Sequence, residues 1–253
     1  MGILDNKKII VMGVANKRSI AWGCAQEMTK QGAEIIYTYQ NERMKKSVSR
    51  LVNDDSRLIE CDVATDESID NAFNEIKEKF GKVDGIVHAI AYARKEELEG
   101  SILNSTRDGY ALAQDVSAYS LLAVAKSAHK LDLLNSPASI VTLTYFGSER
   151  AVPSYNVMGV AKAALEANVR YLARDMGQFG VRVNAISAGA MKTLAVTGIG
   201  GHADLLKESE DRTVDHESVT LEEVGGTCAF LMSTLSTGVV GDTIYVDKGV
   251  HLI

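Results

Sequence analysis

The sequence predicts an α/β fold built on one doubly wound parallel sheet of six or seven strands, with helices on both faces. Two observations lead to this prediction. Short apolar runs rich in β-branched residues alternate along the chain with longer segments of helical periodicity, and glycines follow several of the runs at the points where helices begin. Alternation of this kind is typical of a parallel sheet, because each parallel strand needs a crossover segment before the next one.

The composition favours one domain over residues 1–253. A chain of 253 residues with 46% hydrophobic content can bury a large core, and no repeat, low-complexity segment or Pro-rich linker divides it. The net charge of −6 and the absence of a dense Lys/Arg run give no reason to expect nucleic acid. No apolar run reaches membrane-spanning length and no secretory leader is evident, so we expect no membrane association. The three scattered cysteines lack metal-ligand spacing, which predicts free thiols, a cytoplasmic protein and no metal site.

The expected elements follow from these patterns. Strands are expected at residues 8–12, 34–39, 58–61, 85–89, 140–143, 181–186 and 242–247. Helices are expected from after Gly13 to about 31, and at residues 68–80, 108–130, from after Pro153 to about 176, and 220–231. Thr220 and Glu223 form the pattern of a capping box at the start of the last helix.

The stretch from Tyr145 to Lys162 carries the strongest chemical signal. Tyr155 and Lys162 are seven residues apart, so on a helix they project from nearly the same face. We expect the ammonium to favour the phenolate and so to lower the pKa of Tyr155. Tyr145 adds a second phenol at the carboxyl end of a strand, where open α/β sheets bind ligands. The alternative is a Tyr that only packs and a Lys that is solvated.

The first three strands suggest a Rossmann-type dinucleotide site. Gly13 and the segment up to Ser19 join a strand to a helix N-terminus, which favours phosphate binding, although the glycine fingerprint is incomplete and an ordinary turn has the same pattern. Gln40 ends the second strand without a charge, which favours NADH over NADPH. Asp62 could hydrogen-bond adenine or cap the following turn, and Val63 could cover the ring.

Three further regions have simpler interpretations. His88 lies in a buried apolar run and is expected to be a hydrogen-bonded core residue. The polar residues within 115–120 are expected to serve an interface or the core. The glycine-bearing apolar segment around residues 190–212 is expected to be a lid over the site.

Taken together, the chain resembles the short-chain dehydrogenase/reductase superfamily and, within it, the bacterial NADH-dependent enoyl-[acyl-carrier-protein] reductases. The superfamily in general places its Lys four residues after the Tyr, whereas this subfamily separates them by seven and adds a tyrosine ten residues before, as Tyr145, Tyr155 and Lys162 are placed here. Further matching segments are Gly13, 19–23, 38–41, 61–63, 115–120 and 183–189.

The resemblance implies roles for residues at matching positions. Tyr155 would donate a hydrogen bond to the thioester carbonyl, Tyr145 would assist it, and Ala93 and Met158 would border the substrate. Cofactor contacts would come from Gly13, Ser19, Ile20, Gln40, Asp62, Val63, Ile90, Lys162, Met191, Lys192, Thr193, Leu194 and Ala195. The implied reaction is reduction of an enoyl thioester carried by acyl carrier protein, with NADH as cofactor and NADPH as a second possibility.

The resemblance also implies a homotetramer that uses the helix at 111–128 and the helix after Tyr155. Lys192, Lys207 and Arg212 are candidates to meet an acidic carrier protein, although a solvated mixed-charge helix fits them equally well. Two other functions stay open. A carbonyl reductase would need a hydroxyl such as Ser148 or Ser154 beside the catalytic Tyr, and a non-enzymatic nucleotide-binding protein would keep the fold without turnover.

Overall fold

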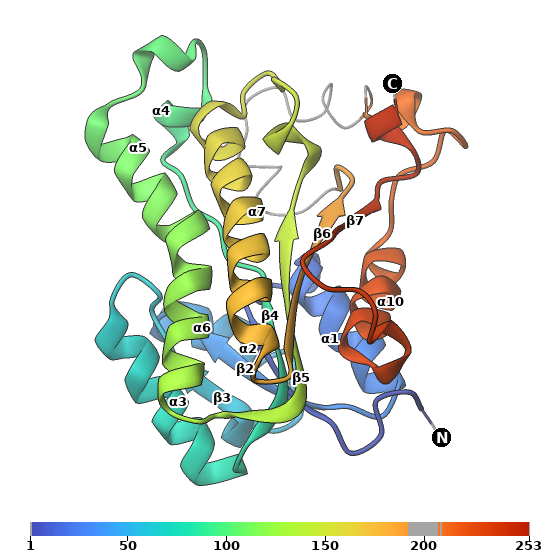
Figure 1. The fold of residues 1–253 in the computed structure, drawn as a ribbon. Coiled ribbons are helices and arrows are strands. Elements are labelled where there is room, and N and C mark those ends of the chain that lie inside the picture. Colours follow the sequence, from blue (N-terminus) through green and yellow to red (C-terminus); the bar gives the residue numbers. More distant parts are fainter. Residues whose placement is uncertain (1, 192–206, 208, 253) are drawn as a thin grey trace.

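The computed structural model describes residues 2–191, 207 and 209–252, and its centre is one seven-stranded sheet (Figure 1). All paired strands run parallel, in the order β3-β2-β1-β4-β5-β6-β7, which confirms the predicted fold class. The strands are β1 (Lys8–Met12), β2 (Glu34–Tyr39), β3 (Leu58–Glu60), β4 (Val83–His88), β5 (Leu134–Thr144), β6 (Val181–Ala188) and β7 (Thr243–Val246). From β1 the chain adds β2 and β3 on one side and then β4 to β7 on the other, so the order of strands changes direction between β1 and β4. Folds of this type bind ligands at the carboxyl edge of the sheet beside that point.

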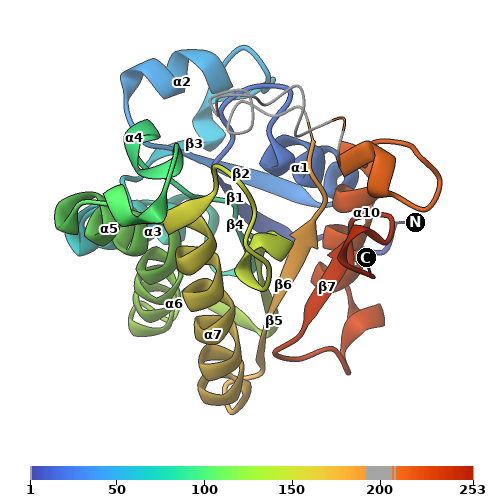
Figure 2. The same cartoon turned by 90° about the horizontal axis from the view of Figure 1, so that it is seen from above.

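Helices cover both faces of the sheet (Figures 1 and 2). They are α1 (Ile20–Lys30), α2 (Glu42–Val48), α3 (Asp66–Phe80), α4 (Lys95–Leu98), α5 (Arg107–Gln114), α6 (Ser120–Lys130), α7 (Asn156–Gly177) and α10 (Leu221–Met232). Two cores result. On one face α3, α6 and α7 pack on residues such as Ile10 and Ile140, and on the other α1 and α10 pack on residues such as Ile9 and Val141. Neighbouring strand residues therefore point to opposite cores, which explains why these runs are apolar throughout.

The helix predicted at 108–130 is interrupted. A π-helical segment, Asp115–Tyr119, separates α5 from α6, so the prediction of one uniform helix was wrong in this detail. Ser117 in this segment accepts a hydrogen bond from the Tyr92 amide at 2.9 Å and donates to the Tyr92 carbonyl at 3.1 Å. The π segment thus ties the helix to the loop after β4.

The remaining boundaries differ little from the prediction. β5 begins at Leu134, six residues before the predicted start, because Asn135, Ser136 and Pro137 interrupt the apolar run from which the strand was predicted. The capping box is confirmed: the Thr220 side chain accepts from the Glu223 amide at 3.2 Å, and the Glu223 carboxylate accepts from the Thr220 amide at 2.8 Å. Among the described residues, no helix combines the length and apolarity that crossing a membrane requires.

Candidate active site

Tyr155 and Tyr145 lie together at the carboxyl edge of the sheet. Tyr155 is the N-cap residue of α7, and Tyr145 follows the last residue of β5. Their rings meet edge to face, with centroids 5.1 Å apart and an interplanar angle of 75°. A Cβ added at Gly147 would lie 2.6 Å from the Tyr155 ring, so only glycine lets the loop after β5 approach the phenol this closely. The structure therefore brings the two predicted phenols into one site.

Lys162 lies two turns along α7 from Tyr155, with only 6% of its surface exposed. Its Nζ donates a hydrogen bond to the Leu143 carbonyl oxygen at 2.7 Å. Burial lowers the pKa of Lys162 to about 8, while the Glu166 carboxylate acts in the opposite direction. A buried lysine near its titration point at neutral pH is unlike the solvated residue of the alternative interpretation, and it is typical of a functional site.

The expectation that Lys162 lowers the pKa of Tyr155 was wrong. Burial raises the pKa of Tyr155, and Tyr145 and Glu166 raise it further. Desolvation disfavours the phenolate, and the negative charge of the Glu166 carboxylate on α7 disfavours it further. Tyr155 is therefore a neutral phenol at physiological pH, which suits a hydrogen-bond donor rather than a base.

Gly13 and Ser19 shape the turn between β1 and α1. Gly13 has a φ of +97°, and a Cβ at this position would lie 2.0 Å from the Ala89 carbonyl oxygen. Ser19 Oγ accepts hydrogen bonds from the amides of Ala15 and Asn16, both at 3.0 Å, so it orders the turn and does not cap its own helix. The first amides of α1, beginning at Ile20, point out of the helix end, and such an end attracts phosphate.

Gln40 and Asp62 meet at the ends of β2 and β3. Gln40 Nε2 donates to Asp62 Oδ2 at 3.2 Å. Asp62 Oδ1 also accepts from the Ala64 amide at 3.1 Å, so the turn-capping role is real. The other Asp62 oxygen faces Gln40, and Val63 beside it is buried. The structure thus joins the two residues expected at the adenosine end of a dinucleotide.

The other predicted site residues lie along the same edge. Ile90 and Ala93 are half-buried in the segment that leaves β4, Met158 is buried on α7, and Met191 is buried after β6. Lys192, Thr193, Leu194 and Ala195 lie outside the described residues, as does most of the predicted lid. Arg212, beyond it, lies over the Phe146 ring with its guanidinium carbon 5.7 Å from the ring centroid.

Comparisons with known proteins identify the family of the chain. A family described as "Enoyl-(Acyl carrier protein) reductase" matches residues 13–251. The enoyl-[acyl-carrier-protein] reductase [NADH] FabI of Enterococcus faecalis is 61% identical, over 98% of this chain and 99% of its own. The chain belongs to the enoyl-[acyl-carrier-protein] reductase family.

Two further relatives bear on structure and cofactor. The crystal structure of the Bacillus cereus enoyl-acyl carrier protein reductase with NADP⁺ and indole naphthyridinone superposes with a TM-score of 0.94 at 46% identity, covering 100% of this chain and 99% of that one. The Staphylococcus aureus relative, 47% identical over 99% of this chain and 98% of its own, is named as an NADPH enzyme. The family therefore contains enzymes named for each cofactor.

His88 is confirmed as a core residue. It is fully buried, with Nδ1 3.0 Å from Thr142 Oγ1 and Nε2 2.9 Å from Ser120 Oγ. Burial, with a smaller contribution from the Lys162 charge, lowers the pKa of His88 to about 3. The imidazole is therefore neutral in the folded reductase and takes no part in acid–base chemistry at physiological pH.

Two buried residues beside the site were missed in the sequence. Glu166 accepts a hydrogen bond from Thr144 Oγ1 at 2.6 Å, and both side chains are buried. Glu166 lies four residues after Lys162, so it falls on the same stripe of α7, which is a signal that could have identified it.

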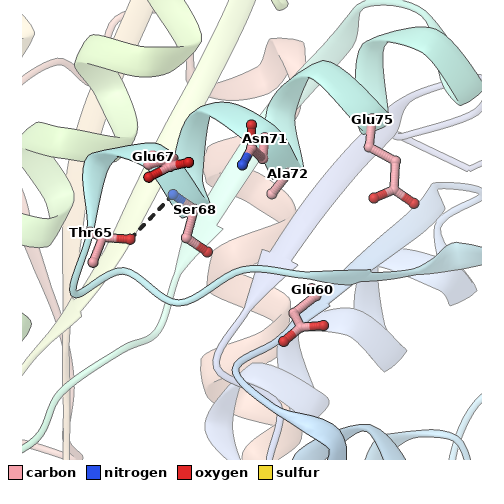
Figure 3. A pocket seen from close by; sticks show the side chains of 7 residues that line it. All are labelled: Glu60, Thr65, Glu67, Ser68, Asn71, Ala72 and Glu75. Carbon is pink, nitrogen blue, oxygen red and sulfur yellow. Dashed lines mark hydrogen bonds between the residues drawn. The ribbon is translucent and has the colours of Figure 1, made fainter.

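A hollow of about 350 Å³ lies apart from these residues, between the end of β3 and α3 (Figure 3). It is lined mainly by polar and acidic side chains: Glu60, Thr65, Glu67, Ser68, Asn71, Ala72 and Glu75. Among the residues that the structure describes, none of the predicted catalytic or cofactor-binding ones lines this hollow, so we do not assign it as the active site.

Proposed function

We propose that the protein reduces the trans-2 double bond of an enoyl thioester carried by acyl carrier protein, with NADH as the hydride donor, in fatty acid elongation. The observation that carries this proposal is the contact between the Tyr155 and Tyr145 rings, with the buried Lys162 two turns along the helix that Tyr155 caps. The chain in which they occur is a member of this reductase family. The same spacing is the feature that distinguishes the subfamily from reductases with a four-residue separation.

Tyr155 supplies the hydrogen bond that the reaction requires. Hydride addition to the β-carbon of an enoyl thioester moves negative charge onto the carbonyl oxygen. A neutral phenol placed at that oxygen stabilises the charge as an oxyanion-hole donor does, and losing one such donor typically costs about 10²–10³ in rate. The raised pKa of Tyr155 keeps its proton in place for this purpose. Tyr145, in edge-to-face contact, holds the ring, and Met158 and Ala93 border the acyl chain.

The residues along the first four strands fit a dinucleotide. When bound, NADH supplies the hydride. The α1 N-terminus with Gly13, Ser19 and Ile20 would hold the pyrophosphate. Gln40, Asp62 and Val63 would hold the adenosine, Ile90 would lie along the cofactor, and Lys162 would bind the nicotinamide ribose. Met191 and the residues 192–195 that follow would hold the nicotinamide end.

The charges after β2 favour NADH. Gln40 is neutral and bonded to Asp62, whose carboxylate would repel a 2′-phosphate. Lys45 is engaged by Glu42 at 3.5 Å and by the Tyr39 ring at 5.5 Å, so it is not free for a phosphate. NADPH remains the second candidate because Arg43 and Lys46 are exposed nearby.

A homotetramer is supported by the outer face of α5, α6 and α7. A hollow of about 530 Å³ lies there, bordered by Gln114 and Asn168 and by the exposed Tyr110, Tyr119 and Leu122. The amide nitrogen of Gln114 is buried and, within the described chain, has no hydrogen-bond partner. A second copy packed on this face would cover the apolar side chains and supply an acceptor.

The carrier protein and the compartment complete the proposal. Lys192, Lys207 and Arg212 stay candidates for carrier docking, and the contact of Arg212 with Phe146 would place that cation beside the catalytic loop. The buried free thiols of Cys24, Cys61 and Cys228 fit a reducing cytoplasm.

The test is oxidation of NADH by the purified protein with a crotonyl thioester, monitored as the loss of reduced-nicotinamide absorbance. A panel of ketones and aldehydes is assayed in parallel, and NADPH replaces NADH in a third series. Turnover confined to the enoyl thioester is the expected result. Turnover of ketones instead would favour the carbonyl reductase, and cofactor binding without any turnover would favour the non-enzymatic protein.

A further inference from the structure

Glu166 is a buried carboxylate that the proposed mechanism does not use. It lies on α7 four residues after Lys162, so the two side chains fall on one stripe of the helix, and Tyr155 is the N-cap residue of the same helix. Only 9% of Glu166 is exposed, and burying a carboxylate is costly unless it is hydrogen-bonded or near a cation. The stripe therefore combines a buried ammonium and a buried carboxylate, next to the half-buried Tyr155 phenol.

The contacts of Glu166 and Lys162 converge on the end of β5. Thr144 Oγ1 donates to Glu166 Oε1 at 2.6 Å, and Lys162 Nζ donates to the carbonyl oxygen of Leu143 at 2.7 Å. Leu143 and Thr144 are the last two residues of the strand. Two buried side chains of opposite charge on α7 are thus hydrogen-bonded to the last two residues of the neighbouring strand.

Two titratable groups near Lys162 are uncharged at neutral pH. His88 on β4 has a pKa of about 3, and the pKa of Tyr155 is raised. Farther out, Tyr245 on β7 is hydrogen-bonded to Glu149, and burial together with the carboxylates of Glu149, Glu166 and Asp247 raises its pKa. Tyr145, beyond Tyr155, is a further phenol. Among these neighbours, Glu166 is the one whose charge favours the ammonium, and burial alone would drive Lys162 toward the neutral amine.

We propose that Glu166 is a positioning residue of the reductase, whose buried carboxylate, fixed by Thr144, keeps the Lys162 amine protonated and directed at the end of β5. The consequence for catalysis depends on the proposed function, because it is the protonated Lys162 that would hold the nicotinamide ribose. The charge relation itself is a property of the protein without cofactor.

The first test measures Lys162 directly in the cofactor-free protein. The Cε–Hε signal of Lys162, assigned by its loss in K162A, is titrated by NMR in the wild type, E166Q and D175N. Asp175 is an exposed carboxylate on the last turns of the same helix and serves as the control of equal charge change. The pKa of Lys162 should fall by about one unit or more in E166Q and stay unchanged in D175N. An unchanged pKa in E166Q would overturn the proposal.

The second test measures NADH affinity by fluorescence at two pH values. With a Lys162 pKa near 8 lowered by about one unit, E166Q should bind NADH about fivefold more weakly than the wild type at about pH 8 and less than about twofold more weakly at about pH 6. Equal losses at both pH values would indicate a purely structural role and would contradict the proposal.

E166D keeps the charge and changes the packing, so it separates the two effects and covers a folding failure of E166Q. It should retain the wild-type pH dependence of NADH affinity. A shift in E166D as large as that expected for E166Q would also overturn the proposal. If the wild type binds NADH but reduces no enoyl thioester, the proposed function fails while the titration of Lys162 still decides the role of Glu166.

Discussion

Two buried polar clusters lie side by side on the sheet, and they differ in how many of their hydrogen-bond donors have an acceptor within the core. The His88 cluster consists of His88, Thr142 and Ser120, and the Lys162 cluster of Lys162, Thr144 and Glu166. Thr142 and Thr144 are two residues apart on β5, so both clusters face the α6 and α7 side of the sheet. They share a strand, a face and a degree of burial.

The His88 cluster is closed. Besides their contacts to the imidazole, Ser120 Oγ donates to the Val116 carbonyl at 2.6 Å and Thr142 Oγ1 lies 3.0 Å from the His88 carbonyl. Each of its polar hydrogens has an acceptor within the core, either in the cluster or at the Val116 carbonyl, and the cluster carries no charge at neutral pH. Groups of this kind fix the packing of a core.

The Lys162 cluster is open. Lys162 has three N–H groups, and within the described residues its recorded hydrogen bond is the one to Leu143. Burial lowers its pKa to about 8, so the amine is still mostly protonated at neutral pH. The Tyr155 phenol lies at the N-terminal end of the same helix. Burial alone therefore does not mark a functional group. Buried polar groups whose donors are not used up within the core mark the site.

The largest expected effect lies at the open end. Tyr155→Phe removes one hydroxyl and should lower kcat/KM for a crotonyl thioester by about 10²–10³, because a single oxyanion donor is lost. The NADH dissociation constant, measured by fluorescence, should stay within about twofold of the wild type. A variant that retained more than about a tenth of the wild-type kcat/KM would show that the Tyr155 hydroxyl is not the oxyanion donor, and the Lys162 cluster would then not mark the active site.

The second effect is a pH dependence of stability in the closed cluster. The pKa of His88 is about 3 in the folded protein against 6.5 in the unfolded chain, so the unfolded state takes up more protons as the pH falls. Stability present above about pH 6.5 is therefore lost toward about pH 3, and about 3 kcal/mol should be lost by about pH 4.5.

The measurement is the free energy of unfolding in urea at several pH values for the wild type and His88→Asn. The asparagine cannot titrate, so the decline between about pH 6.5 and 4.5 should flatten in the variant. A variant with the same slope as the wild type would show that His88 is not the group responsible.

The third effect separates the clusters through matched substitutions. Thr142→Val and Thr144→Val remove the same hydroxyl from the same strand face. Thr142→Val should cost about 1–3 kcal/mol of unfolding free energy by leaving His88 short of a partner, with kcat/KM nearly unchanged. Thr144→Val, which frees Glu166, should lower kcat/KM more than Thr142→Val does. Indistinguishable kinetics in the two variants would contradict the division of roles.

The sequence predicted much of the sheet and of the catalytic stripe because both follow from periodicity. The helix predicted after Pro153 is present, with Tyr155 as its N-cap residue and Lys162 two turns along it. Glu166 follows from the same periodicity, but its partner Thr144 depends on how α7 packs on β5, which no local pattern encodes.

Two other differences have distinct causes. The π segment could be anticipated only from Ser117 and Ser120, polar residues in an apolar helix, because their partners lie in other parts of the chain. The pKa of Tyr155 was predicted in the wrong direction, since the spacing of charges along the chain contains no information on desolvation.

The roles of Tyr155 and Lys162 are best decided by a crystal structure of the protein with NAD⁺ and an unreactive enoyl-thioester analogue. We expect the Tyr155 hydroxyl to lie within about 2.6–3.2 Å of the thioester carbonyl oxygen. We also expect the Lys162 amine to contact the nicotinamide ribose. A complex in which either side chain lies beyond hydrogen-bond reach of its predicted partner, with the carbonyl bound by another donor, would rule these roles out.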